Sequence, residues 1–383
     1  MKTTSLDRLY SISVALSLIL HVFNELQFSD DVKAFHVATA LACVFFVLKQ
    51  KKKDKVFKYS IVFIFGSFIS CLVSPADNLM PTISLGLVLF SCLGIKDLDT
   101  NFLLKVINLG IPIALLGLLY HYFQEILFRY SGYYTDPNYL CTTLLLFLFL
   151  ILYEFLESHT LLIKILLLCE ILVIIFLIAS TLSRTGLLCS LILLVISFSA
   201  FLKRNKFKSS IVLLAVLGGI LLWQPEIIST TVEGFEMRQE YTKDDDVNSA
   251  GHLRAELSLS GVTYVLEHPE YWLQGIGVEG TNHRNKFSGM KQPSGNLRDH
   301  NTITSLFTEH GIIGVVCFVQ IMIGLWTCLK RLPKSRKRTI LYAAIISLLL
   351  FSLSIYQLYF LPFWFYIFIL FNLSNSEIKK ISV

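Results

Sequence analysis

A histidine and an asparagine lie where a long apolar run begins, in RDHNTITSLFTEHGIIGVV at residues 298–316. Asn301 is a good N-cap for a helix that starts there. His300 comes one residue earlier, where the positive end of the helix dipole disfavours a protonated imidazole. A neutral His300 could accept a proton as a general base. The alternative is that His300 is only a polar residue that ends a loop.

Glu309 and His310 lie further along the same apolar run. Ionisable side chains within a membrane span are costly unless they face protein or water. Glu309 is therefore a candidate for an acceptor-binding or structural site, together with Asn301.

Two arginines precede this region. Arg184 lies in the tight turn STLSRTGLL (residues 180–188), between two long apolar segments. Arg184 could bind an anion, or it could be a snorkelling side chain that anchors the end of a helix. Arg254 lies in a helical pattern that Ser249 could cap and Pro269 ends, and it could instead be a solvated surface residue. The following LQGIGVEG does not have dinucleotide-loop spacing and predicts a tight turn that returns the chain towards the membrane.

Acidic residues stand in two further places. Asp136 and Asn138 flank Pro137, which predicts a turn that starts a helix or a polar pair at the mouth of a helix bundle. Residues 244–246 are three consecutive aspartates, which are typical of a solvated loop more often than of a metal site. We therefore predict no metal and no cofactor.

The rest of the chain must position these residues, and its composition is that of a membrane protein. Of the 383 residues, 54% are hydrophobic and 16% are charged, where a soluble domain would have about 25%. Stretches of 15–20 apolar residues recur, and about 20 are needed to cross a bilayer. We predict an all-α integral membrane protein with about twelve spans, at residues 9–26, 32–48, 59–73, 80–94, 102–121, 139–156, 161–180, 185–202, 209–223, 303–329, 339–356 and 358–373.

The distribution of charge predicts the orientation. Basic clusters at residues 49–55, 203–208 and 330–338 fall on one side, which receives 23 of the 33 Lys and Arg residues. The positive-inside rule assigns that side to the cytoplasm. The predicted domains are an N-terminal bundle of about nine spans (1–224), a large periplasmic loop with short helices (225–302) and C-terminal spans (303–383). The loop carries 12 acidic and 7 basic residues, which argues against nucleic acid as a partner.

Two arginines and a neutral histidine on an outer face suit one kind of reaction. Arginines bind phosphates and offset the charge that develops when a diphosphate leaves. The histidine would take a proton from an attacking hydroxyl group. Because nucleotide sugars are not expected outside the cytoplasm, the diphosphate would be carried by a lipid of the bilayer.

Four segments in this order resemble the bacterial O-antigen polymerase and O-antigen ligase superfamily. They are DPNYL, STLSRTGLL, the segment GHLRAELSLSGVTYVLEHPEYWLQGIGVEG and RDHNTITSLFTEHGIIGVV, which together cover about residues 130–325. By motif, Arg184 and Arg254 resemble the arginines proposed to bind the lipid diphosphate. His300 resembles the proposed catalytic base.

The resemblance implies an inverting, metal-independent glycosyltransferase of the bacterial inner membrane with its site facing the periplasm. The donor would be a glycan on undecaprenyl diphosphate, and a flippase and a chain-length regulator would be further partners. A polymerase would use another lipid-linked repeat as acceptor and build O-antigen or capsule, while a ligase would use lipid A-core. DPNYL before a mid-chain span favours the polymerase.

Two other classes compete with the enzyme. A polysaccharide flippase would need charged residues along several spans and has little use for a long outer loop. A non-catalytic membrane scaffold would explain the hydropathy but not Arg184, Arg254 and His300 on one face.

Overall fold

The part of the chain that the structure describes is almost entirely helical. The computed structural model describes residues 4–24, 26–29, 32–49, 54–76, 79–124, 129–202, 249–290 and 301–381. Its α-helices are α1 (Ser5–Val22), α2 (Ala34–Leu48), α3 (Lys55–Val73), α4 (Leu79–Cys92), α5 (Thr100–Gln124), α6 (Pro137–Glu157), α7 (Leu161–Ser180), α8 (Arg184–Leu202), α11 (Ser249–Glu267), α12 (Thr302–Arg331), α13 (Arg336–Ser352) and α14 (Leu361–Ile381). Three short 3-10 helices are η1 (Ile95–Asp97), η2 (Pro269–Tyr271) and η3 (Gly280–Lys286), and β1 (Gln27–Ser29) pairs antiparallel with β2 (Val32–Lys33).

The helices agree with a protein that crosses a membrane several times. Seven helices of the described residues are long and apolar enough to span a bilayer. Every predicted span coincides with a helix except 209–223, which lies outside the described residues. The α2 helix has only 15 residues, fewer than the roughly 20 that a perpendicular span needs. The coarse prediction of a helical, multi-span protein is thus confirmed, whereas the count of twelve stays a prediction.

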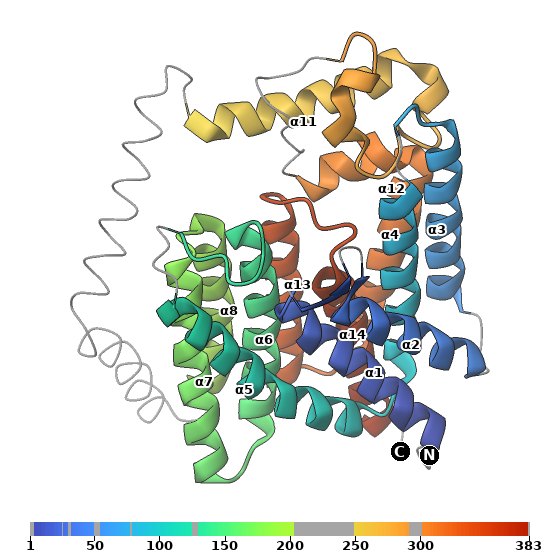
Figure 1. Ribbon diagram of the computed structural model, residues 1–383. Helices are drawn as coiled ribbons and strands as arrows, with labels where there is room; N and C mark the ends of the chain where they lie inside the picture. Colours follow the sequence, from blue (N-terminus) through green and yellow to red (C-terminus); the bar gives the residue numbers. More distant parts are fainter. Residues whose placement is uncertain are drawn as a thin grey trace.

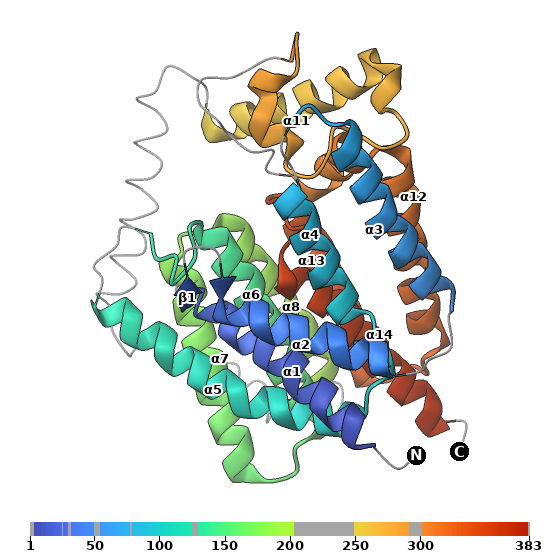
Figure 2. The same cartoon turned by 45° about the vertical axis from the view of Figure 1, so that its right-hand side comes forward.

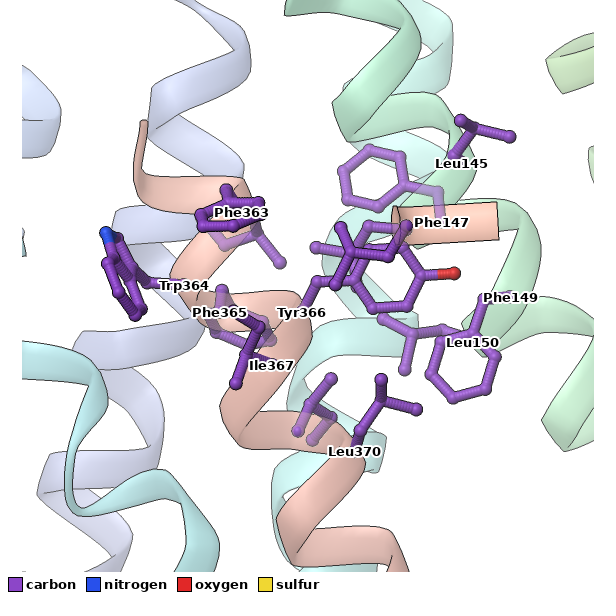
Figure 3. Close-up of a cluster of buried hydrophobic side chains, with 14 of the residues drawn as sticks. Leu145, Phe147, Phe149, Leu150, Phe363, Trp364, Phe365, Tyr366, Ile367 and Leu370 are labelled. Carbon is purple, nitrogen blue, oxygen red and sulfur yellow. The ribbon is translucent and has the colours of Figure 1, made fainter. Parts of the chain in front are cut away.

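Large buried aromatic side chains lie on α6 and α14. Phe149 of α6 stacks on Tyr366 of α14, with ring centroids 5.3 Å apart. Trp364 is fully buried, and its indole N–H donates to the carbonyl of Leu358. Figure 3 shows Tyr366 pointing from α14 towards Phe147 and Phe149 of α6, with Leu150 and Leu370 nearby. Such large side chains fix the relative position of α6 and α14, on which the site described below depends.

The opposite ends of α6 and α14 are also tied. The Lys337 ammonium lies 2.6 Å from a Glu157 carboxylate oxygen and 3.0 Å from one of Glu377. These residues come from α13, α6 and α14, so one cation joins three helices. Figure 1 shows this end away from α11, which lies across the other end of the bundle.

The span predicted at 303–329 is wrong in one respect, because α12 is broken. At Gly311 the backbone leaves the helical region, with φ 60° and ψ −162°. One segment, residues 302–310, lies beneath α11, and the next, residues 312–331, descends beside α3 (Figures 1 and 2). A helix break frees backbone groups that must find other partners inside the protein.

The predicted glycine turn supplies those partners. Gly275 and Gly277 have φ of 71° and 94°, which confirms the turn. The amides of Ile276 and Gly277 donate to the carbonyls of Thr308 (2.9 Å) and Glu309 (3.1 Å). On the far side of the break, the amides of Ile312 and Ile313 donate to Trp272 (2.8 Å) and Leu273 (3.1 Å). The loop before α12 is therefore paired with α12 by its backbone.

Glycine is required at both sides of this pairing. A Cβ at residue 311 would lie 2.5 Å from the backbone carbon and oxygen of Leu273, and one at residue 275 would lie 2.4 Å from the Glu309 carbonyl carbon. Two serines of α3 and its C-cap Ser74 complete the junction. Ser67 contacts the His310 ring nitrogen Nδ1 (3.0 Å), Ser70 donates to the Glu309 carbonyl (3.1 Å) and Ser74 donates to the Ile276 carbonyl (2.6 Å).

We predict that Gly311→Ala destabilises the protein strongly. The backbone conformation alone should cost about 1–3 kcal/mol with any side chain, and the contact with Leu273 adds to it. Gly86→Ala is the matched control, since a Cβ there meets only ordinary contacts at 3.6 Å within α4. Thermal unfolding in detergent should show a melting temperature several degrees lower for Gly311→Ala and little change for Gly86→Ala. Equal melting temperatures would contradict the proposed role of the break.

Candidate active site

The first part of the site is the start of α6. Asp136 is the N-cap, and its carboxylate accepts from the backbone amide of Asn138 (2.7 Å) and from the side-chain amide of the same residue (2.9 Å). Pro137 occupies the first helical position, where its missing N–H has no cost. The predicted helix-starting turn is thus confirmed.

The second part is the turn between α7 and α8. Leu182 has a positive φ of 51°, which lets the chain reverse within a few residues. Ser183 then caps α8, because its hydroxyl accepts from the amide of Gly186 (3.2 Å). Arg184 is the first residue of α8, and its side chain is exposed. The tight turn predicted around Arg184 is confirmed, and the exposed guanidinium is free to meet a ligand or the membrane interface.

These two parts are joined directly. The Ser183 hydroxyl donates to the side-chain oxygen of Asn138 at 2.7 Å. Asn138 is buried and so links the Asp136 carboxylate to the residue before Arg184. Two sequence motifs that are more than forty residues apart therefore form one polar junction at the starts of α6 and α8.

The junction continues to α12 through Thr142 and Gln357, which no sequence pattern had indicated. Thr142 donates to the Asn138 carbonyl (3.2 Å) and accepts from the side-chain amide of Gln357 (3.1 Å). The backbone amide of Gln357 donates to the hydroxyl of Thr302 (3.1 Å), the first residue of α12. We call Ser183, Asn138, Thr142, Gln357 and Thr302 the Gln357 network. Gln357 is fully buried within an apolar stretch, and such a lone amide was the signal available in the sequence.

Glu309 lies at the other end of the first segment of α12. It is 1% exposed and accepts from the Thr281 hydroxyl (2.8 Å) and from the Tyr356 hydroxyl. The predicted requirement that Glu309 and His310 face protein is met, because His310 is also buried and packs on Phe63 with ring centroids 4.8 Å apart. Glu309 thereby connects η3 and the α13–α14 connection to α12.

The remaining predicted residues lie at the edge of what the structure describes. Asn301 is the N-cap of α12 as predicted, and its side chain accepts from the amides of Ile303 (2.9 Å) and Thr304 (3.3 Å). Arg254 belongs to α11, which confirms the predicted helix, while its side chain lies outside the described part. His300 and residues 244–246 lie outside the described residues as well.

A further arginine of the loop, missed in the sequence, holds it together. Arg284 of η3 is buried, and its guanidinium donates to the Ser260 hydroxyl (2.6 Å) and the Leu257 carbonyl (3.0 Å) on α11. Beside it, an apolar cluster packs α11 onto the loop and onto the end of α3; its buried members are Ala76, Tyr264, Val265, Ile276, Phe287 and Met290. This small core fixes α11 above α12.

The Gln357 network can be tested by a double-mutant cycle. Thr142→Val leaves the Gln357 amide without its acceptor, so we expect it to cost about 1–3 kcal/mol of unfolding free energy. Once Gln357→Met has removed the amide, Thr142→Val should lower the unfolding free energy much less. Unfolding by sodium dodecyl sulfate should therefore give a coupling energy of about 0.5–3 kcal/mol between the two substitutions. Ser17→Ala is the control partner for Gln357→Met, because the Ser17 hydroxyl donates to the Ser13 carbonyl of its own helix α1. If the effects of Thr142→Val and Gln357→Met on the unfolding free energy were as additive as those of the control pair, the result would argue against the network.

Comparison with known proteins found one similarity. Residues 170–319 match the family model described as O-antigen ligase. The match includes Arg184, Arg254, His300 and Glu309, whereas Asp136 and Asn138 precede it. The search of curated proteins returned no match. The match covers less than half of the chain, and over residues 170–319 the chain is similar to this O-antigen ligase family.

Proposed function

We propose that this protein transfers a glycan from a lipid-linked diphosphate to a sugar hydroxyl and thereby polymerises repeats of a surface polysaccharide. The family match supports a glycan-transferring membrane enzyme. The observation that carries the proposal is the Gln357 network, since it joins the turn of Arg184 to the start of α12, next to His300. In this proposal the donor carrier is undecaprenyl diphosphate.

The proposed reaction needs one base and a site for the leaving diphosphate. His300 takes the proton of the acceptor hydroxyl while its oxygen attacks the anomeric carbon of the donor. The bond from that carbon to the diphosphate oxygen breaks, and its electron pair stays with the diphosphate. Attack from the opposite side inverts the anomeric configuration. Arg184 and Arg254 offset the charge on the leaving group, so no metal ion is needed.

The positions of two helix starts favour an anion near Arg184. The first turns of α6 and α8 are held together by the bond between Ser183 and Asn138. The start of each helix carries partial positive charge, although Asp136 binds a first-turn amide of α6 and Ser183 binds one of α8. Arg184 adds a full charge at the start of α8. A diphosphate near this junction would gain from Arg184 and from the start of α8, because the Asp136 carboxylate offsets the positive end of α6.

The same proposal places this end of the bundle in the periplasm. The turn of Arg184 and α11 lie at one end in Figure 1, and the Lys337 ion pairs lie at the other. The basic clusters of the sequence assign the latter end to the cytoplasm. A lipid-linked donor delivered by a flippase would then reach Arg184 from the outer leaflet.

A ligase is the second candidate, because the matching family is described as O-antigen ligase. Its donor site would be identical, and lipid A-core would replace the second lipid-linked repeat as acceptor. The segment DPNYL at the start of α6, which resembles the polymerases, keeps the polymerase as our first proposal.

Deletion of the gene, followed by complementation, tests both parts of the proposal in a host that makes lipopolysaccharide. Without a polymerase, the strain should show lipid A-core with a single repeat and no ladder. Wild type and Asp245→Ala should restore the ladder, while His300→Ala, Arg184→Ala and Arg254→Ala should fail. Loss of a general base typically lowers the rate about 10²–10⁴-fold. Arg184→Lys should also be weak, since lysine lacks the bidentate guanidinium.

Other outcomes would revise the proposal in different ways. Bare lipid A-core with accumulated lipid-linked polymer would identify a ligase with the same donor site. Full complementation by His300→Ala at normal protein levels would contradict the proposed base. Inhibition of the purified protein by EDTA that a divalent ion reverses would contradict the metal-independent reaction.

A further inference from the structure

Arg129 lies beside the turn of Arg184 and has no role in the family match, which begins at residue 170. Its guanidinium Nε donates to the carbonyl of Thr181 at 3.3 Å. The next residue, Tyr130, donates its backbone amide to the Ser180 carbonyl (3.0 Å), and its hydroxyl donates to the Leu118 carbonyl (2.6 Å). Tyr130 is buried, so the segment that carries Arg129 is held against the end of α7.

The Arg129 guanidinium is only partly satisfied by the described residues. Its Nη2 atom is enclosed by protein and has no hydrogen-bond partner among them. None of their carboxylates forms an ion pair with it either. A charged donor that is removed from water without an acceptor is costly, and such groups are rare unless a ligand or ion completes them.

Arg129 and Arg184 belong to the same turn. Arg129 binds the Thr181 carbonyl, the Thr181 hydroxyl accepts from the amide of Ser183, and Arg184 follows Ser183 directly. The Arg129 guanidinium is thus bonded to the same segment of four residues that carries Arg184, at the positive end of α8. Two planar guanidinium groups suit an anion with several oxygens on two phosphorus atoms.

We propose that Arg129 is a second ligand of the diphosphate that Arg184 binds. The inference rests on the proposed function, and it adds a residue to the donor site from outside the matched region. The half-buried guanidinium donates to a phosphate oxygen while Nε keeps its bond to the Thr181 carbonyl. Arg129 therefore both positions the turn and contacts the leaving group.

Two substitutions separate binding of the diphosphate from support of the turn. Arg129→Gln keeps an N–H donor for the Thr181 carbonyl but has no charge. Arg129→Lys keeps the charge. If Arg129 only supports the turn, both variants should bind diphosphate equally. If Arg129 binds the diphosphate, Arg129→Lys should retain more affinity for it than Arg129→Gln. A higher salt concentration should reduce this difference in affinity between the two variants.

The experiment measures binding of geranylgeranyl diphosphate to the purified full-length protein in detergent. We expect Arg129→Gln to weaken binding about 10-fold to 100-fold, as for loss of a hydrogen bond to a charged group. Arg338→Gln is the matched control, because the Arg338 guanidinium also donates to a backbone carbonyl, that of Leu332 (2.8 Å), at the other end of the bundle. Its affinity should equal that of wild type, and melting temperatures verify that each variant is folded.

The outcomes separate this inference from the proposed function. Wild-type affinity in folded Arg129→Gln would overturn the role of Arg129, whether or not the enzyme transfers glycan. Equal losses in Arg129→Gln and Arg129→Lys at every salt concentration would overturn it as well, in favour of support of the turn alone. Diphosphate binding that depends on the charge at residue 129, in a protein that transfers no glycan, would support the role of Arg129 while contradicting the proposed transfer reaction.

Discussion

The break of α12 at Gly311 is the constraint on which the rest of the site depends. A continuous helix would have no backbone groups to offer the preceding loop. Because it is interrupted, the carbonyls of Thr308 and Glu309 accept from the turn at Gly275–Gly277, and the amides of Ile312 and Ile313 donate back to the loop. Four backbone hydrogen bonds thus convert a long connection into a part of the helix bundle.

The break also decides where polar side chains can lie in an apolar protein. The first segment of α12 has Thr302 at one end, in the Gln357 network, and Glu309 at the other, bonded to Thr281 and Tyr356. Both ends contact the α13–α14 connection, whose Tyr356 and Gln357 lie side by side in the sequence. A short helix segment held at both ends is a rigid support for the adjoining residues, and these include His300 in our proposal.

Local patterns in the sequence were sufficient to predict the helices and turns that carry the site. Asn301 as a cap, the turn of Arg184, the helix that Pro269 follows and the turn at Gly275 all depend on residues within a few positions of one another. The break at Gly311 was missed because hydropathy continues unchanged through it. The Gln357 network and the clamp of Arg284 on α11 were missed because they join residues that are far apart in the chain, and one sequence does not reveal such contacts.

Amide hydrogen exchange across residues 272–278 tests the docking of the loop on the broken helix most directly. If the backbone pairing exists, the amides of Ile276 and Gly277 should exchange far more slowly than in an unstructured peptide of the same sequence, and those of Ile312 and Ile313 should be protected with them. Exchange of all four amides at the rate of the free peptide, in protein that remains folded, would contradict the account.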